Sequence, residues 1–277
     1  MRRFLSSLAI AVALAAPIVP MSVTPAVAQE LEIVEILDAL GYQTYAEHIE
    51  GLYRATPDDP TMDEGQRANW TKAAAGLFSS QDIIDAATLG LEDLTEVEIQ
   101  VISEFYESDL AKTVTEMEVA VQDTARADEI EQAVDAYGET LPDLSPERLT
   151  LILELENAFG SADDTVAQVM NFQIGLMRGM ADSNIGTAPL NEAEILLLVQ
   201  SNADLIRAEI EESAGKWAGY TYRDLTDDQF ATYLAFLQTD AAQRLYGLTD
   251  LAVLQIVERD AYRLGQIYGL LETSQEL

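Results

Sequence analysis

The chain has 277 residues, nearly half of them hydrophobic, and it combines 49 acidic residues with only 15 basic ones for a formal net charge of −34. So negative a chain is repelled by nucleic acid and by anionic lipid, which excludes both as natural ligands. Cysteine is absent and only one histidine is present, which excludes disulfides and zinc sites built from these two residue types.

The first 28 residues have the organisation of a secretory signal peptide. Arg2 and Arg3 precede an apolar run that two prolines interrupt, and Ala26 to Ala28 form a small-x-small cleavage site before Gln29. A retained membrane anchor is the alternative, but the interrupted run is short for one. We therefore expect cleavage between Ala28 and Gln29, giving an exported protein that is periplasmic or secreted, without a membrane span. Both removed charges are basic, so the mature chain would carry a formal charge of −36.

Four stretches of the mature chain begin with the same helix-start signal. A polar N-cap residue is preceded by leucine and followed four residues later by an apolar residue, which is the hydrophobic staple. The four N-caps are Thr95, Ser145, Asn191 and Thr226. Glu98, Glu194 and Gln229 complete capping boxes at three of these starts. No alternating strand pattern is present, so we predict an all-α fold.

Apolar residues recur at helical spacing elsewhere in the chain as well. The clearest sets are Leu149, Ile152, Leu155 and Phe159; Met170, Ile174 and Met177; and Ile195, Leu198, Val199 and Ile206. Gly and Pro clusters predict breaks at Gly41, 56–60, 138–142, 160–161 and 184–189. The Gly175-x-x-x-Gly179 step predicts the close approach of a neighbouring helix. We expect Met170, Met177 and Met180 to lie in the core, with an adaptable partner groove as the alternative.

Two twenty-residue stretches, 93–112 and 224–243, are alike at a constant offset of 131 residues. Six positions are identical, and apolar residues of both stretches follow the i, i+3, i+7 spacing of one helix face. Thr95 and Thr226 would each begin a helix that carries Phe105 or Phe236 in the core. Ser108 and Thr239 would each cap a second helix after a bend. We therefore predict a multi-helix array or bundle of two pseudo-equivalent repeats, 29–142 and 143–277, which pack as one unit.

The repeated run, Leu-Thr-x-x-Glu/Gln-apolar-x-x-apolar-x-x-Phe-x-x-Ser/Thr, resembles the signature of the bacterial family called domain of unknown function 2059. In that family proline and then glycine follow, where this chain has Asp109 and Ala111 and then Asp240 and Ala242. The similarity extends over most of the mature chain and is greatest from 171 to 277, as in two-copy alphaproteobacterial members. The resemblance implies an exported helical protein. The family has no established activity, so it assigns no catalytic residue.

Motifs that could carry chemistry are weak in this chain. His48 has no nucleophile elbow to accompany it, and Ser213-x-x-Lys216 lacks the companion motifs of penicillin-recognising enzymes. The acidic loop 58–65 lacks the glycine and glutamate that an EF-hand requires. We accordingly assign no catalytic residue, no metal site and no cofactor.

Three functional hypotheses remain after these exclusions. The first is a non-enzymatic exported protein that binds an envelope protein or ligand, or has an accessory role in the envelope. The second is a carboxylate-dependent hydrolase acting on an envelope glycan, which requires a deep cleft with two or more acids of raised pKa. The third is reversible binding of an apolar ligand between the helices. An exposed apolar patch would favour the first hypothesis.

Overall fold

The computed structural model describes residues 32–159, 162–183 and 190–275, and these residues form helices joined by short turns. The predicted cleavage site at Ala28 and Gln29 and the predicted breaks at 160–161 and 184–189 lie outside the described residues. No strand occurs in the three described ranges, so the prediction of an all-α fold is confirmed.

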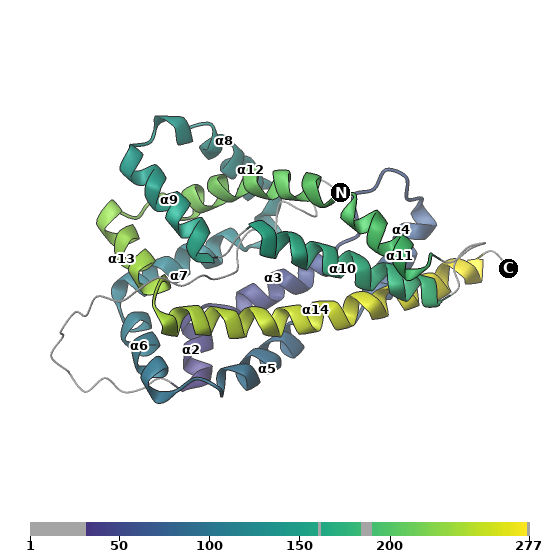
Figure 1. Ribbon diagram of the computed structural model, residues 1–277, viewed down its shortest axis with the longest axis horizontal. Coiled ribbons are helices and arrows are strands. Elements are labelled where there is room, and N and C mark those ends of the chain that lie inside the picture. The colour runs from purple at the N-terminus through teal and green to yellow at the C-terminus, as the bar shows by residue number, and fades with distance from the viewer. Residues whose placement is uncertain (1–31, 160–161, 184–189, 276–277) are drawn as a thin grey trace.

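The described helices follow one another in the order shown in Figure 1. The α-helices are α2 (Ile33–Ala39), α3 (Tyr42–Arg54), α4 (Glu64–Ala74), α5 (Ser80–Leu91), α6 (Glu96–Tyr106), α7 (Asp109–Val121), α8 (Ala127–Gly138), α9 (Pro146–Phe159), α10 (Ala162–Asp182), α11 (Glu192–Gln200), α12 (Ala203–Thr221), α13 (Asp227–Leu237) and α14 (Asp240–Gln275). Two short 3₁₀ helices, η1 (Thr124–Arg126) and η2 (Leu141–Asp143), flank α8.

The four predicted helix starts have the expected geometry. Asn191 accepts the backbone N–H of Glu194, whose carboxylate accepts the N–H of Asn191 in return. Ser145 accepts the N–H of Arg148 at 3.0 Å at the start of α9. Gly41 lies between α2 and α3 and has φ +66°, a backbone conformation that glycine adopts without strain. One of the predicted breaks therefore falls at a position that favours glycine.

Helix α14 is the longest helix and runs through the middle of the molecule, where it packs against α10, α5, α4 and α6 (Figure 1). The main hydrophobic core of the described residues follows it, extending in sequence from Ile36 to Tyr268, so both predicted repeats contribute to this core. Val166, Val169, Ile206 and Ile210 form a smaller second cluster between α10 and α12.

Glycines allow α10 and α14 to lie unusually close together. A Cβ atom on Gly179 would stand 2.0 Å from the carbonyl oxygen of Tyr262, and one on Gly265 would stand 2.1 Å from that of Leu176. Any larger residue would therefore force the two backbones apart. The close helix approach predicted from the Gly175–Gly179 step is thereby confirmed, with Gly265 as its counterpart on α14.

The methionines of α10 do not occupy the innermost positions. Val169 and Phe172 are buried, whereas Met170, Met177 and Met180 are half-buried. Met180 packs against the main core and Met170 against the smaller cluster. The expectation that these methionines lie in the core is therefore wrong in detail, because Gly175 and Gly179 take the positions of α10 that face α14.

A buried ion cluster ties α14 to the turn between α4 and α5. Asp260 is 1% exposed, accepts the N–H of Phe78 at 2.8 Å and receives the guanidinium groups of Arg259 and Arg263. Burial raises the pKa of this carboxyl, but the hydrogen bonds from Arg259 and Phe78 outweigh it and hold the pKa below its usual value. The bond to Phe78 holds a residue with φ +53°, a conformation that is costly outside glycine.

Candidate functional site

The four hydroxyl residues of the repeated stretches all cap helices. Thr95 and Thr226 accept the N–H groups of Glu98 and Gln229 at the starts of α6 and α13. Ser108 accepts the N–H of Ala111 at the start of α7, and Thr239 accepts that of Ala242 at the start of α14. The role that the structure shows for these four residues is therefore structural, because each one caps the start of a helix.

The two repeated phenylalanines lie face to face although 131 residues separate them. The ring centroids of Phe105 and Phe236 are 3.7 Å apart and the ring planes differ by 5°. Tyr106 meets Phe236 edge-on and Tyr233 stacks beside Phe105. Phe236 is buried, whereas Phe105 is only half-buried against the main core. The structure thus brings together two predicted site residues as an aromatic joint between α6 and α13.

Beside this joint, tyrosines surround the carboxyl group of Glu118 on α7. The hydroxyls of Tyr222 and Tyr233 donate to the same carboxylate oxygen of Glu118, at 2.5 and 2.7 Å. Tyr106 and Tyr246 contact each other through their hydroxyls at 2.8 Å. Burial raises the pKa of Glu118, and the two tyrosine hydrogen bonds offset only part of that rise. A satisfied network of this kind fixes one arrangement of the helices.

A second acid of raised pKa lies on α14. Burial raises the pKa of Asp250 from 3.8 to about 7. Burial, followed by the charge of Asp250, raises the pKa values of Tyr42 and Tyr45 on α3. The hydroxyl of Tyr42 donates to the carbonyl oxygen of Thr249 at 3.0 Å, which fixes α3 against α14 next to this acid. Asp250 therefore belongs to the packing between α3 and α14.

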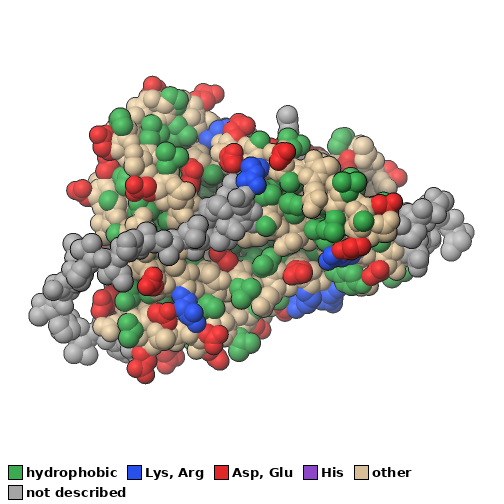
Figure 2. Space-filling model, viewed as in Figure 1, with side chains coloured by type: hydrophobic (Ala, Val, Ile, Leu, Met, Phe, Trp, Pro, Cys, Tyr) green, Lys and Arg blue, Asp and Glu red, His purple; other side chains and the backbone are tan. Residues whose placement is uncertain are grey.

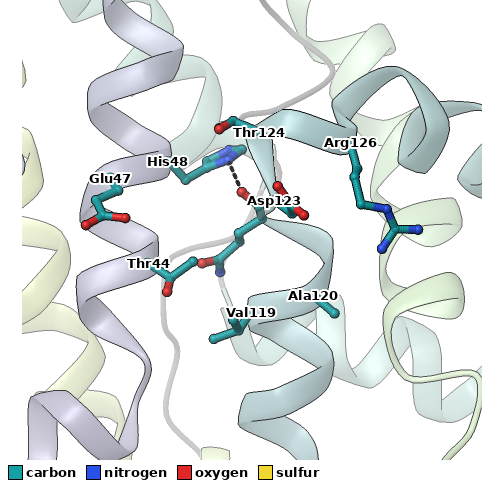
Figure 3. A pocket seen from close by; sticks show the side chains of 9 residues that line it. Thr44, Glu47, His48, Val119, Ala120, Asp123, Thr124 and Arg126 are labelled. Carbon is teal, nitrogen blue, oxygen red and sulfur yellow. Dashed lines mark hydrogen bonds between the residues drawn. The ribbon is translucent and has the colours of Figure 1, made fainter.

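His48 lines a small surface pocket between α3 and the end of α7 (Figure 3). The pocket has a volume of about 320 Å³, and its acids are Glu47 and Asp123. The Nδ1 atom of His48 lies 3.2 Å from the carbonyl oxygen of Gln122, so the ring joins two helices. Neither Glu118 nor Asp250 lines this pocket. It therefore differs from the deep acid-lined cleft that the hydrolase hypothesis requires.

The other weak motifs are engaged in local structure. The hydroxyl of Ser213 donates to the carbonyl of Ile210, and the amino group of Lys216 faces Glu212 and Asp135. Asp59 accepts the backbone and hydroxyl groups of Thr61, and the described ranges contain no cluster of three or more potential metal ligands.

Helix α11 has apolar residues on every side. Ile195 and Val199 are buried, while Leu197 is 70% exposed and Leu198 is 44% exposed. Leu198 shares the helical spacing of its buried neighbours, so its exposure differs from the sequence expectation. An amphipathic surface helix normally has a polar outer face, and a helix that is apolar all round is normally covered on all sides.

Two further exposed leucines flank α11. They are Leu190, just before its N-cap, and Leu205, in the first turn of α12, at 44% and 61% exposure. We call Leu190, Leu197, Leu198 and Leu205 the α11–α12 leucines. Figure 2 shows hydrophobic side chains at the surface over this end of the molecule, with acidic side chains distributed around them. Because exposed apolar patches mark candidate interaction sites, these leucines make α11 and the start of α12 a candidate docking surface.

The Glu118 network, Asp250 and the exposure of the α11–α12 leucines were not predicted from the sequence. Only the leucines had a usable signal, because three consecutive leucines within one short helix cannot all face the same core. Glu118 and Asp250 look like any of the 49 acids in the sequence, and only tertiary packing distinguishes them.

Comparison with family models, curated proteins and solved structures gave no match for this chain. None of the helices described is long and apolar enough to cross a membrane.

Proposed function

We propose that this protein is exported and acts by binding another macromolecule, in a periplasmic or envelope-accessory role, through the α11–α12 leucines. The observation that carries the proposal is the exposure of Leu197 and Leu198 on a helix that buries Ile195 and Val199. Burial of such side chains releases about 25 cal/mol per Å² of apolar surface, so a partner that covers them gains affinity. Export rests on the signal-peptide pattern of residues 1–28.

The relation between the two halves is part of this proposal. Two pseudo-equivalent repeats would explain why Thr95 and Thr226 cap the first helix, why Ser108 and Thr239 cap the second, and why Phe105 and Phe236 stack. The resemblance of both runs to the family of unknown function 2059 supports a repeated, exported helical architecture. In that arrangement the two repeats together supply the scaffold, and α11 and the start of α12 within the second repeat supply the binding surface.

The hydrolase hypothesis has weaker support. Burial raises the pKa values of Glu118 and Asp250, but the first is held by two tyrosines and the second lies between α3 and α14. The pocket at His48 contains other acids. Binding of an apolar ligand between the helices is also less favoured, because the apolar residues that lack cover lie on the outside of α11.

Export and binding are tested separately. N-terminal sequencing of the exported protein should begin at Gln29, whereas retention of residue 1 in a membrane fraction would contradict export. For binding, the mature protein is used to recover partners from envelope extract beside two variants. Leu197→Gln combined with Leu198→Gln should abolish recovery of a specific partner. Leu89→Gln, which changes an equally exposed leucine on α5, should retain it. Equal recovery by all three proteins would contradict the proposed binding surface.

A further inference from the structure

The acidic surroundings of the α11–α12 leucines restrict what can cover them. Three exposed carboxylates, Glu194, Asp204 and Glu211, lie on the same two helices. The carboxylate of Glu194 accepts the N–H of Asn191 at 2.8 Å. Arg207, the basic residue nearest to Leu205 along the chain, is half-buried. The exposed Arg178 of α10 is the basic side chain at the start of α11, and it is paired with Glu192. A partner therefore meets an apolar surface on which exposed carboxylates outnumber exposed basic side chains.

Two common occupants of apolar surfaces are disfavoured by this charge. A second copy of the chain would bring the same carboxylates and the same overall charge, and like charges facing each other cost free energy. An anionic lipid surface is repelled for the same reason. A basic partner is attracted instead, and opposite charges around an apolar centre accelerate association and select the partner.

The dimensions of the surface favour a helix as the docking element. Helix α11 spans nine residues, which corresponds to about 13 Å of helix axis. Leu197 and Leu198 are exposed on its outer side, and Leu205 lies in the first turn of the next helix, which follows the two-residue connection 201–202. An amphipathic helix of about three turns can place apolar side chains against these leucines and basic side chains against the flanking acids.

We infer that the α11–α12 leucines and their flanking carboxylates bind a basic amphipathic helix of a partner protein. This inference rests on the proposed function, which it deepens by naming the chemistry of the partner. The leucines supply the apolar contact, and Glu194, Asp204 and Glu211 attract lysine or arginine side chains at its edge. Because the contact is small and partly electrostatic, binding weakens as salt rises.

Direct binding of labelled synthetic peptides to the purified mature protein tests the inference. The probes are three fourteen-residue peptides: an amphipathic helix of leucine and lysine, the same pattern with glutamate in place of lysine, and a lysine–serine peptide without an apolar face. Fluorescence anisotropy should show binding of the leucine–lysine peptide at least ~10-fold tighter than of either other peptide. Its affinity should fall about 3- to 10-fold between 50 and 500 mM salt, as expected for partly screened charges.

Variants of the protein locate the contact. Leu197→Gln combined with Leu198→Gln should lower the affinity for the leucine–lysine peptide at least ~10-fold. Asp204→Lys should lower this affinity about 3-fold or more. Leu89→Gln should leave its affinity unchanged, although Leu89 is 69% exposed and also lies near acids of its own segment, Asp85 and Glu92. Circular dichroism should show that all variants keep the wild-type helix content, because the altered side chains are exposed.

Four results would overturn the inference. They are equal binding of the lysine–serine peptide, equal binding of the leucine–glutamate peptide, an equal loss in the Leu89→Gln variant, and a dimer in sedimentation that the Leu197/Leu198 variant abolishes. The last result would identify a second copy as the occupant. If envelope recovery still depended on Leu197 and Leu198 while the basic peptide failed to bind, the proposed function would stand and only this partner class would be wrong.

Discussion

The helix pairs α6–α7 and α13–α14 begin with the same sequence pattern and the same caps, yet they occupy different depths in the molecule. Phe230 and Phe236 on α13 are buried, whereas Ile99 and Phe105 at the matching positions of α6 are half-buried. Helix α7 has 13 residues and ends near the surface pocket, whereas α14 has 36 and forms the central axis of the core. Matched local sequence therefore specifies a helix–bend–helix unit, while the surrounding helices decide how deeply each unit is buried.

The largest effect should come from the contact that places α14 at the centre. Gly265→Ala puts a methyl group about 2.1 Å from the carbonyl oxygen of Leu176, and backbone atoms on α10 cannot move aside as a side chain could. We expect a loss of at least ~4 kcal/mol in the free energy of unfolding, or failure to fold. Chemical denaturation followed by circular dichroism measures it.

Gly247→Ala is the matched control on the same helix, because a Cβ atom there meets nothing within 4 Å. Alanine is the better helix former, so this variant should be unchanged or more stable by ~0.5–1 kcal/mol. Similar destabilisation by both substitutions would show that helix α14 tolerates no change, and that the close contact with α10 is not the cause.

The phenylalanine pair tests the difference in depth directly. Phe236→Ala should cost about 3–4 kcal/mol in unfolding free energy, because the side chain is buried and its removal leaves a cavity. Phe105→Ala should cost less, about 1–3 kcal/mol, because the side chain is only half-buried and water can fill the space. Equal costs would contradict the depth argument.

The double variant of the two phenylalanines isolates the stacking contact between them. Its cost should fall short of the sum of the two single costs by about 0.5–1.5 kcal/mol, the usual coupling of an aromatic pair. Additive costs would show that the rings contribute only through their separate burial.

The second helices of the two pairs each carry an acid of raised pKa, and this comparison predicts a pH dependence. The pKa of Asp250 rises from 3.8 to about 7 in the folded protein, so between these values the folded protein holds a proton that the unfolded chain has released. Its contribution to stability is thus present below pH 4 and lost as the pH rises to 7. Asp250→Asn should therefore be more stable than the wild type by about 1–3 kcal/mol at pH 8, with little difference near pH 3.5.

Denaturation midpoints at pH 3.5, 6 and 8 measure this effect. Glu118→Gln on α7 should show the same direction with a smaller change, because the tyrosine hydrogen bonds offset part of the rise in the pKa of Glu118. Asp204→Asn at an exposed position controls for the general relief of negative charge. If the stabilities of Asp250→Asn and the wild type changed in parallel with pH, a raised pKa of Asp250 would be contradicted.

The sequence predicted what depends on short-range physics. Thr95, Ser108, Thr226 and Thr239 could be identified as caps because a cap and its acceptor N–H groups lie within three residues. The glycine contact was visible as spacing on α10, but its partner Gly265 was not, because helix pairing is a property of the fold. The exposure of individual apolar side chains was the least predictable quantity. Leu198 has the helical spacing of a core residue, yet it is exposed because no described helix covers that side of α11.

The smallest effect should come from the caps, where the two helix pairs are most alike. Thr95→Ala and Thr226→Ala each remove a hydroxyl that accepts a backbone N–H, at 3.3 and 3.2 Å. Each leaves in place the reciprocal bond that the backbone N–H of the same position donates to the N3 side chain. Both threonines are exposed, so neither variant creates a cavity. Each should cost about 1 kcal/mol in unfolding free energy, and the two costs should agree within ~0.5 kcal/mol despite the different depths of α6 and α13.

Thr→Ser at either position should restore most of the loss, because serine caps as well as threonine. If Thr226→Ala cost as much as Phe236→Ala, capping and burial would not be separable in α13, and the depth of burial would govern the stability of the helix ends as well as that of the core.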